Sequence, residues 1–118
     1  MSEFEDDPPP PIRAGPANHF KGIEAVGGRL WLTDSHLCFR SHGVNFQIHT
    51  QSFPLESIRS VKPCRTLWIL PNGLLVTLND GVRHRFVVGR RREWATDVEF
   101  ARRRRLEALD AKASSAAR

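Results

Sequence analysis

Apolar and polar residues alternate along much of the chain between residues 17 and 89, and this period of two is typical of half-buried β-strands. The clearest stretch covers residues 27–41, GGRLWLTDSHLCFRS, where a polar turn separates two short alternating runs. We expect one face of this meander to enter a core and the other to face outward. The residues expected in the core are Leu30, Leu32, Leu37 and Phe39. Those expected on the opposite face are Arg29, Trp31, Cys38 and Arg40.

Further alternating runs extend this meander, and turn residues separate them. Phe20 is the expected core residue of the first strand. Asn79-Asp80-Gly81 is the strongest hairpin signal, because Asn-Gly and Asp-Gly sequences tolerate positive φ. Pro71-Asn72-Gly73 predicts a second turn, and Pro54 with Leu55 predicts a short turn packed on the core. The expected strands cover residues 17–24, 29–34, 36–42, 46–53, 58–65, 67–70, 74–78 and 82–89.

Residues 90–111 contain no glycine or proline and consist mostly of good helix formers, which predicts a helix. Trp94, Val98 and Ala101 fall on one face at helical spacing, and that face becomes polar at Arg105. We therefore expect the first half of the helix to pack on the sheet and the second half to project into solvent. Together, the pattern predicts a mainly β fold, an antiparallel sheet or partly open barrel capped by a C-terminal helix.

The 118 residues suit one domain with tails. We expect a disordered leader over residues 1–16, which is acidic and rich in proline, and a folded domain over residues 17–101. Residues 102–118 are expected to form an Arg-rich helix extension with a frayed tail from residue 113. The leader lacks the apolar segment of a signal peptide, and no apolar run approaches the roughly 20 residues that span a bilayer.

The formal net charge of +5 is unevenly distributed. Residues 83–105 carry nine arginines against three acids, whereas residues 1–12 carry four acids and no base. The run Arg102, Arg103, Arg104 and Arg105 is open to two interpretations. It is either a solvated helix end paired with acids such as Glu99, or a surface for membranes or acidic partners. No recognition motif or aromatic stacking set accompanies the run, which argues against nucleic acid.

The sequence offers no catalytic or metal-binding constellation, so we expect a protein without enzymatic activity or cofactor. Asp34, Ser35 and His36 are adjacent, but a catalytic triad is assembled by geometry and not by adjacency. The five histidines lack the paired spacing of a zinc site. Cys38 and Cys64 are expected to be reduced thiols of a cytosolic protein, with a bridge between them as the alternative.

An ordered set of motifs resembles the GRAM domain, and Trp94 matches the aromatic residue of that family's helix. The motifs are Phe20-Lys21-Gly22, residues 27–34 (GGRLWLTD), residues 37–40 (LCFR), Phe53-Pro54-Leu55 with Ile58, and Asp80-Gly81 followed by residues 85–88 (RFVV). The resemblance covers residues 17–100. It implies the pleckstrin-homology-like fold, a partly open antiparallel barrel or sandwich capped by the helix.

The resemblance also implies a candidate site for anionic head groups. Lipid-binding pleckstrin-homology domains carry a Lys and then Arg or Lys, x, Arg across the first two strands. Lys21 and Arg29 fit the first two positions, whereas Trp31 occupies the third. Arg40 on the next strand can substitute for the missing arginine, because neighbouring strands lie about 5 Å apart. Alternatively, the three basic residues are ordinary solvent-facing positions, and the turn at residues 34–36 lacks two basic residues common in the family.

The function implied by this resemblance is that of a non-catalytic binding module. One interpretation is a cytoplasmic module that is peripheral at a membrane surface and binds anionic lipid head groups. The alternative is a protein-interaction adaptor or self-associating structural module with no lipid ligand. In that case Pro8–Pro11 or an open sheet edge would provide the contact.

Overall fold

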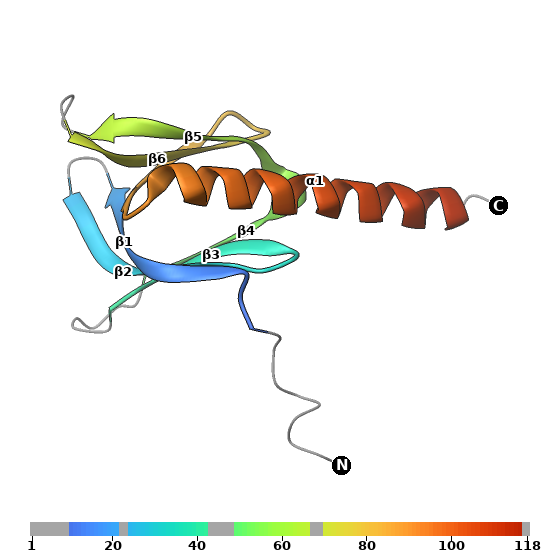
Figure 1. The fold of residues 1–118 in the computed structure, drawn as a ribbon, viewed down its shortest axis with the longest axis horizontal. Coiled ribbons are helices and arrows are strands. Elements are labelled where there is room, and N and C mark those ends of the chain that lie inside the picture. The colour runs from blue at the N-terminus through green and yellow to red at the C-terminus, as the bar shows by residue number, and fades with distance from the viewer. Residues whose placement is uncertain (1–9, 22–23, 43–48, 67–69, 117–118) are drawn as a thin grey trace, which may run out of the picture.

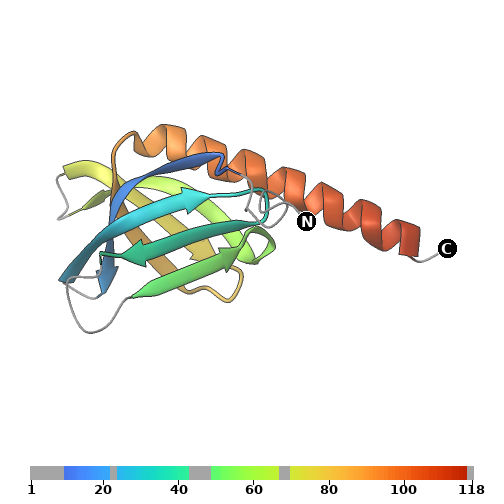
Figure 2. The same cartoon turned by 90° about the horizontal axis from the view of Figure 1, so that it is seen from below.

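A computed structural model of the chain describes residues 10–21, 24–42, 49–66 and 70–116. It contains one seven-stranded antiparallel sheet in the order β4-β3-β2-β1-β7-β6-β5 and one long helix. The elements are β1 (Arg13–Lys21), β2 (Glu24–Leu32), β3 (His36–Ser41), β4 (Thr50–Pro54), the 3-10 helix η2 (Leu55–Ser57), β5 (Ile58–Thr66), β6 (Leu70–Leu78), β7 (Arg83–Val88) and α1 (Arg91–Ala116). The sheet curls into a partly open barrel, and α1 lies between its two halves (Figure 1, Figure 2).

The core lies inside the curled sheet and has the composition that the alternation predicts. Leu30, Leu32, Leu37 and Phe39 are fully buried, which confirms the inward set of the opening meander. Phe39 packs against Phe86 of β7 at a ring-centroid distance of 5.7 Å, so the two halves of the sheet share one core. The outward set is also confirmed, because its members are exposed or half-buried.

The first strand differs from the prediction. It begins at Arg13 and not at residue 17, so residues 13–16 of the expected leader belong to the sheet. β1 pairs with β2 along its whole length but with β7 only from Ala17 to His19. Pro16 lies outside the part paired with β7, so no hydrogen bond to β7 is lost because proline has no N–H. Phe20 is half-buried and is not a core residue, because it lies on the opposite face of β1 from buried Ala17 and His19.

The turn predicted at Pro71-Asn72-Gly73 is wrong. These residues lie inside β6, where Gly73 pairs with Cys64 on one side and with Val87 on the other. The chain instead accommodates its proline at the beginning of β6, opposite an irregularity of β5 between Cys64 and Thr66. Parts of five expected segments lie outside the described residues, namely 1–9 of the leader, 22–23 of the first strand, 46–48 of the fourth strand, 67–69 of the sixth and 117–118 of the tail.

Two predicted turns are confirmed. The β6–β7 hairpin turns at Asn79-Asp80-Gly81, where Gly81 has a φ of 91° and its N–H donates to the Leu78 carbonyl. Leu55 in η2 is fully buried, so the short turn after β4 packs on the core as expected.

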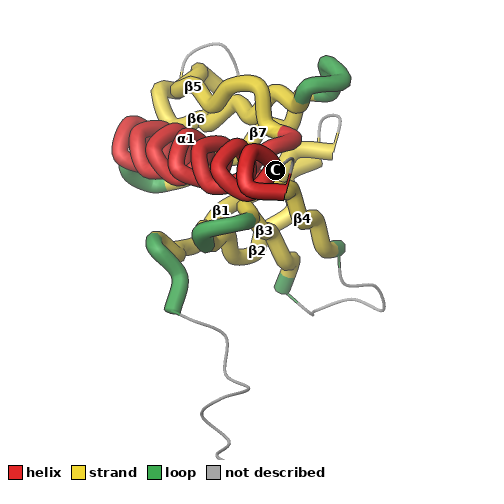
Figure 3. The backbone as a smooth tube through the Cα atoms, turned by 90° about the vertical axis from the view of Figure 1, so that its right-hand side faces the viewer, coloured by secondary structure: helices red, strands yellow, loops and turns green. Residues whose placement is uncertain are grey.

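Helix α1 packs through its N-terminal half only. Trp94, Val98 and Ala101 are buried, which confirms the docking face, and the C-terminal half extends beyond the sheet (Figure 1, Figure 2). Figure 3, seen from the C-terminal end, shows α1 between β5 and β6 on one side and β1 and β2 on the other. The expectation that the chain frays from residue 113 is wrong for residues 113–116, because α1 continues to Ala116. Good helix formers and pairs of opposite charge one turn apart support the projecting part.

Candidate anion-binding surface

The structure places two of the three predicted site residues side by side. Arg29 of β2 and Arg40 of β3 are cross-strand partners, and both are exposed on the outer face of the sheet. Among the residues that the structure describes, neither forms an ion pair. Like charges directly opposite on neighbouring strands repel each other, so this pair offers an anion two guanidinium groups at one place.

Lys21 is not brought to this pair. It is the last residue of β1 and pairs with Glu24, whereas the β1 partner of Arg29 is Pro16. Five residues of extended chain separate Lys21 from Pro16, which corresponds to about 16 Å. The side chain of Lys21 itself lies outside the described residues.

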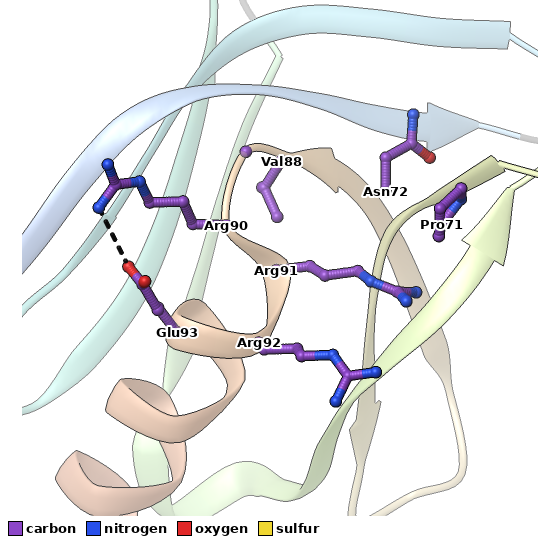
Figure 4. Close-up of a pocket in the computed structure, with 8 residues that line it drawn as sticks. Pro71, Asn72, Val88, Arg90, Arg91, Arg92 and Glu93 are labelled. Carbon is purple, nitrogen blue, oxygen red and sulfur yellow. Dashed lines mark hydrogen bonds and ion pairs between the residues drawn. The ribbon is translucent and has the colours of Figure 1, made fainter.

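A second group of arginines lines a shallow cleft where β7 meets α1 (Figure 4). The cleft has a volume of about 520 Å³ and lies between residues 88–93 and the beginning of β6. Arg91 and Arg92 extend toward Pro71 and Asn72 of β6, whereas Arg90 extends the other way, toward Glu93. Three consecutive arginines therefore line one hollow, and two of them, Arg91 and Arg92, extend to the side of Pro71 and Asn72.

The backbone at this cleft is unusual. Arg90 has a φ of 56° and is the one non-glycine residue with positive φ in the described part of the chain. The left-handed region costs an ordinary L-residue about 1–2 kcal/mol. The Arg90 carbonyl accepts the first hydrogen bond of the helix from the Trp94 N–H at 3.0 Å, so this conformation sets the direction in which α1 leaves the sheet.

Positive charge continues from the cleft onto the outer face of β5–β7. Arg91 donates a hydrogen bond of 2.7 Å from Nη1 to the Cys64 carbonyl of β5. Burial raises the pKa of the Cys64 thiol, and the nearby charges of Arg85 and Arg91 oppose that shift. Lys62 and Arg85 are exposed and lie in one row across the three strands, on either side of Leu75. Cys64 and Cys38 are both free thiols, and no bridge joins them.

A second hollow of about 520 Å³ adjoins this cleft. It is lined by Asn72 and residues 87–89 on one side and by Pro16 on the other. Pro16 is the strand partner of Arg29, so the hollow ends one strand away from the Arg29–Arg40 pair. We refer to the two arginine groups and the Lys62–Arg85 row together as the arginine surface. Its basic members are Arg29, Arg40, Lys62, Arg85, Arg90, Arg91 and Arg92.

The Arg-rich run of α1 is largely engaged within the chain. Arg102 and Arg103 form ion pairs with Glu99 at 2.7 and 3.2 Å, and Arg105 approaches Glu56 of η2 at 3.6 Å. Arg104 lies over the Phe100 ring at 5.8 Å. The hydrogen bond from Arg102 holds the pKa of Glu99 below its usual value, although burial opposes the shift. The prediction that Glu99 pairs with this run is thus confirmed.

The residues considered for catalysis or metal binding do not assemble such a site. The His36 ring bonds to Ser35 Oγ at 2.7 Å, but none of the hydrogen bonds found among the described residues joins it to Asp34. Within the same residues, no group of three or more His, Cys, Asp or Glu can hold a metal ion. No described helix is long and apolar enough to cross a membrane.

Two groups of residues are not apparent from the sequence. Arg85 and Arg90–Arg92 are visible there only as part of a charge excess, for which the density of arginine in residues 83–105 is the available signal. His19, His49 and His84 have no evident connection in the sequence, although their ring nitrogens meet at 2.9 and 3.1 Å. The bonded pairs are 30 and 65 positions apart, so no local spacing indicates the cluster.

Comparison with known protein families decides the relationship. The GRAM domain family matches residues 18–100, which is most of the chain and nearly all of its folded part. The chain belongs to the GRAM domain family. This membership confirms the resemblance found in the motifs, and no curated protein matches the chain significantly.

Solved structures share the fold of this GRAM domain at low sequence identity. The C-terminal domain of an unknown protein from Leishmania infantum is 15% identical with a TM-score of 0.64, over 79% of this chain and 83% of that chain. The Slm1-PH domain in complex with inositol-4-phosphate is 12% identical with a TM-score of 0.64, over 81% and 99%. The same domain in complex with phosphoserine is 13% identical with a TM-score of 0.61, over 77% and 94%. The predicted pleckstrin-homology-like fold is therefore confirmed.

Proposed function

We propose that this GRAM domain is a non-catalytic module that binds phosphate-bearing anionic head groups at a membrane surface through the arginine surface. The observation that carries the proposal is the cleft lined by Arg90, Arg91 and Arg92, with the charge of Arg85 acting on Cys64 together with that of Arg91. Arginine suits this role because its planar guanidinium can donate two parallel hydrogen bonds to phosphate oxygens. The shallow, open shape suits a head group presented by a surface.

The Arg29–Arg40 pair supplies a second contact in this proposal. It lies on the outer face of β2 and β3, next to Pro16, which lines the hollow that adjoins the cleft. Lys21 keeps the role implied by the family resemblance, as a third contact from the end of β1. The Slm1-PH structures with inositol-4-phosphate and phosphoserine support the chemistry, because a domain of the same fold accepts phosphate-bearing ligands.

The proposed location is the cytoplasm, with reversible attachment to the anionic face of a membrane. Two free cysteines support a reducing compartment. Each arginine near a negatively charged bilayer contributes about 1 kcal/mol, and this attraction falls off within a Debye length of about 8 Å at physiological salt. Attachment by this surface should therefore be weak for each contact and strongly dependent on salt.

Vesicle flotation with the full chain tests the proposal. Vesicles of neutral lipid, of neutral lipid with phosphatidylserine, and of neutral lipid with a phosphoinositide are compared at 50 and 300 mM salt, conditions that separate charge from head-group recognition. The Arg85→Gln/Arg92→Gln variant should bind several-fold more weakly than the wild type. The matched control is Arg103→Gln/Arg104→Gln, which removes the same charge from the projecting helix and should bind like the wild type. Equal binding by both variants would refute the assignment of the cleft.

A second candidate function is contact with another protein, and one apolar groove favours it. The groove has a volume of about 350 Å³ and lies between the beginning of β1 and α1, where Ile12 and Phe100 are 55% and 61% exposed. Sedimentation equilibrium tests the self-association form of this alternative. Concentration-dependent dimerisation that is lost in Phe100→Ser would support it, and a monomer at all concentrations would oppose it.

A further inference from the structure

Three histidines meet inside the sheet and form a hydrogen-bonded chain. His19 Nδ1 lies 2.9 Å from His49 Nε2, and His19 Nε2 lies 3.1 Å from His84 Nδ1. His19 is 97% buried and stacks on the His49 ring at 5.1 Å with an angle of 5° between the planes. One buried imidazole therefore uses both of its nitrogens to join two others.

The chain joins the two halves of the curled sheet. His19 belongs to β1, His84 belongs to β7, and His49 precedes β4. The backbone holds His49 in place, because its N–H donates to Ser41 Oγ at 2.7 Å and its carbonyl accepts from the Ser41 N–H at 2.8 Å. The backbones of all three histidines are thus held in place, two of them by strands and that of His49 by Ser41.

The surroundings of the chain are mainly apolar. His19 packs against Phe39 of β3 and Phe86 of β7, and its β2 strand partner is Val26. His84 packs against Phe53 of β4, and its β6 strand partner is Val76. Among the described residues, Asp80 of the β6–β7 turn is the acidic group whose charge affects the protonation of His84. Arg83 and Arg85 lie on the opposite face of β7.

Proton counting limits what this chain can hold. Each of its two links needs one proton between two nitrogens, and three neutral imidazoles carry three protons in total. Two protons occupy the links and the third lies on an outer nitrogen. One further proton can bind at the other outer nitrogen and leave both links intact. A second additional proton finds both outer nitrogens already protonated, so it must bind at a link nitrogen. Two N–H groups then face each other across that link, and its hydrogen bond breaks.

We infer that His49, His19 and His84 act as one proton-responsive link between the two halves of the sheet, which stays intact with at most one added proton and opens when a second proton binds in mild acid. This device is separate from the arginine surface and does not depend on the proposed function. Burial lowers the pKa of His84, Asp80 opposes that shift, and the neighbouring His49 adds to it. The folded protein therefore binds fewer protons than the unfolded chain just below the ordinary histidine value of 6.5, so stability falls as the pH falls through this range.

Urea unfolding of the full chain between pH 8 and pH 5 tests the inference. For the wild type, the unfolding equilibrium constant should rise below about pH 6.5, by up to about tenfold per pH unit for each extra proton that the unfolded state binds. His19→Phe keeps an aromatic ring against Phe39 and Phe86 but removes both links. The dependence of its unfolding equilibrium constant on pH should correspond to about one fewer proton taken up on unfolding. The control His42→Asn changes an exposed imidazole and should keep the wild-type slope. Equal slopes for wild type and His19→Phe would overturn the inference.

A direct measurement on the wild type covers the case in which His19→Phe does not fold. Scalar coupling between ring nitrogens across an N–H···N bond reports each link by nuclear magnetic resonance. Both couplings should be present at pH 8 and at least one should disappear by pH 5. Absence of coupling at pH 8, or persistence of both couplings at pH 5, would contradict a proton-responsive link.

Discussion

Arg29 and Arg40 face each other as cross-strand partners on β2 and β3, on the exposed side of the sheet. Two like charges at this spacing destabilise the strand pair. A bound ligand of opposite charge would relieve this repulsion. The pair therefore links the stability of this GRAM domain to its proposed binding of anionic head groups.

The first prediction reverses one of these charges. Arg40→Glu should stabilise the protein by up to about 1 kcal/mol, because it creates an opposite-charge pair with Arg29. The same change should weaken flotation with anionic vesicles. Urea unfolding and flotation measure the two effects. In the double variant Arg29→Glu/Arg40→Glu the gain in stability should disappear, since like charges face each other again. A single variant that is less stable than the wild type would contradict the argument.

The second prediction concerns the left-handed backbone at Arg90. Asparagine tolerates this region better than arginine, so Arg90→Asn should stabilise the protein by about 1 kcal/mol. The lost ion pair with Glu93 is long, at 3.5 Å, and exposed, so its removal costs little. Binding to anionic vesicles should fall. Arg92→Asn is the control for the charge, because it should weaken binding without a gain in the free energy of unfolding.

Much of the fold is predictable from the sequence because it depends on local patterns. The alternation from Leu30 to Phe39 follows directly from the geometry of a strand, and the Asp80-Gly81 turn follows from the φ that it requires. The wrong predictions of strand bounds and turns concern the pairing between strands. Pro16 and Pro71 are breakers by local rules, yet both lie in strands where the neighbouring strand does not need their N–H.

The candidate site was harder to predict because it depends on register and on contacts between distant segments. Lys21 and Arg29 are eight positions apart in the sequence, but the tight β1–β2 hairpin leaves them five rows apart in the sheet. The Arg91–Cys64 contact joins the beginning of α1 to β5, and the histidine chain joins three separate segments. Only the closure of the barrel brings these groups together.

The third prediction concerns Gly28, which lies in the motif that resembles the GRAM family. A Cβ atom there would lie 2.2 Å from the Arg40 carbonyl oxygen and 2.8 Å from the Phe39 ring. Since backbone must move to relieve this contact, Gly28→Ala should destabilise the protein by about 3 kcal/mol. Gly89→Ala is the control, because nothing lies within 4 Å of its added Cβ, and it should change the free energy of unfolding by less than about 0.5 kcal/mol. Similar effects of the two substitutions in urea unfolding would refute this explanation.

The fourth prediction concerns the ion pairs of α1 near the point where its projecting half begins, and their dependence on acid. Glu99 accepts hydrogen bonds from Arg102 and Arg103, and the bond from Arg102 keeps the pKa of Glu99 below its usual value of 4.5. A carboxyl whose pKa is depressed in the folded state stabilises the protein above that usual value and loses this contribution as the pH falls further. Glu99→Gln should therefore show a smaller loss of stability and of helical circular dichroism between pH 5 and pH 3 than the wild type.

The control for this prediction is Glu107→Gln, which changes an exposed carboxylate of the same helix and should keep the wild-type acid dependence. The window from pH 5 to pH 3 lies below the range assigned to the histidine chain, so the two effects can be measured separately. If Glu99→Gln loses stability in acid as steeply as the wild type, the Glu99 ion pairs do not hold the helix. The arginines of the run would then be free to bind anionic surfaces, and the Arg103→Gln/Arg104→Gln variant should show weaker flotation.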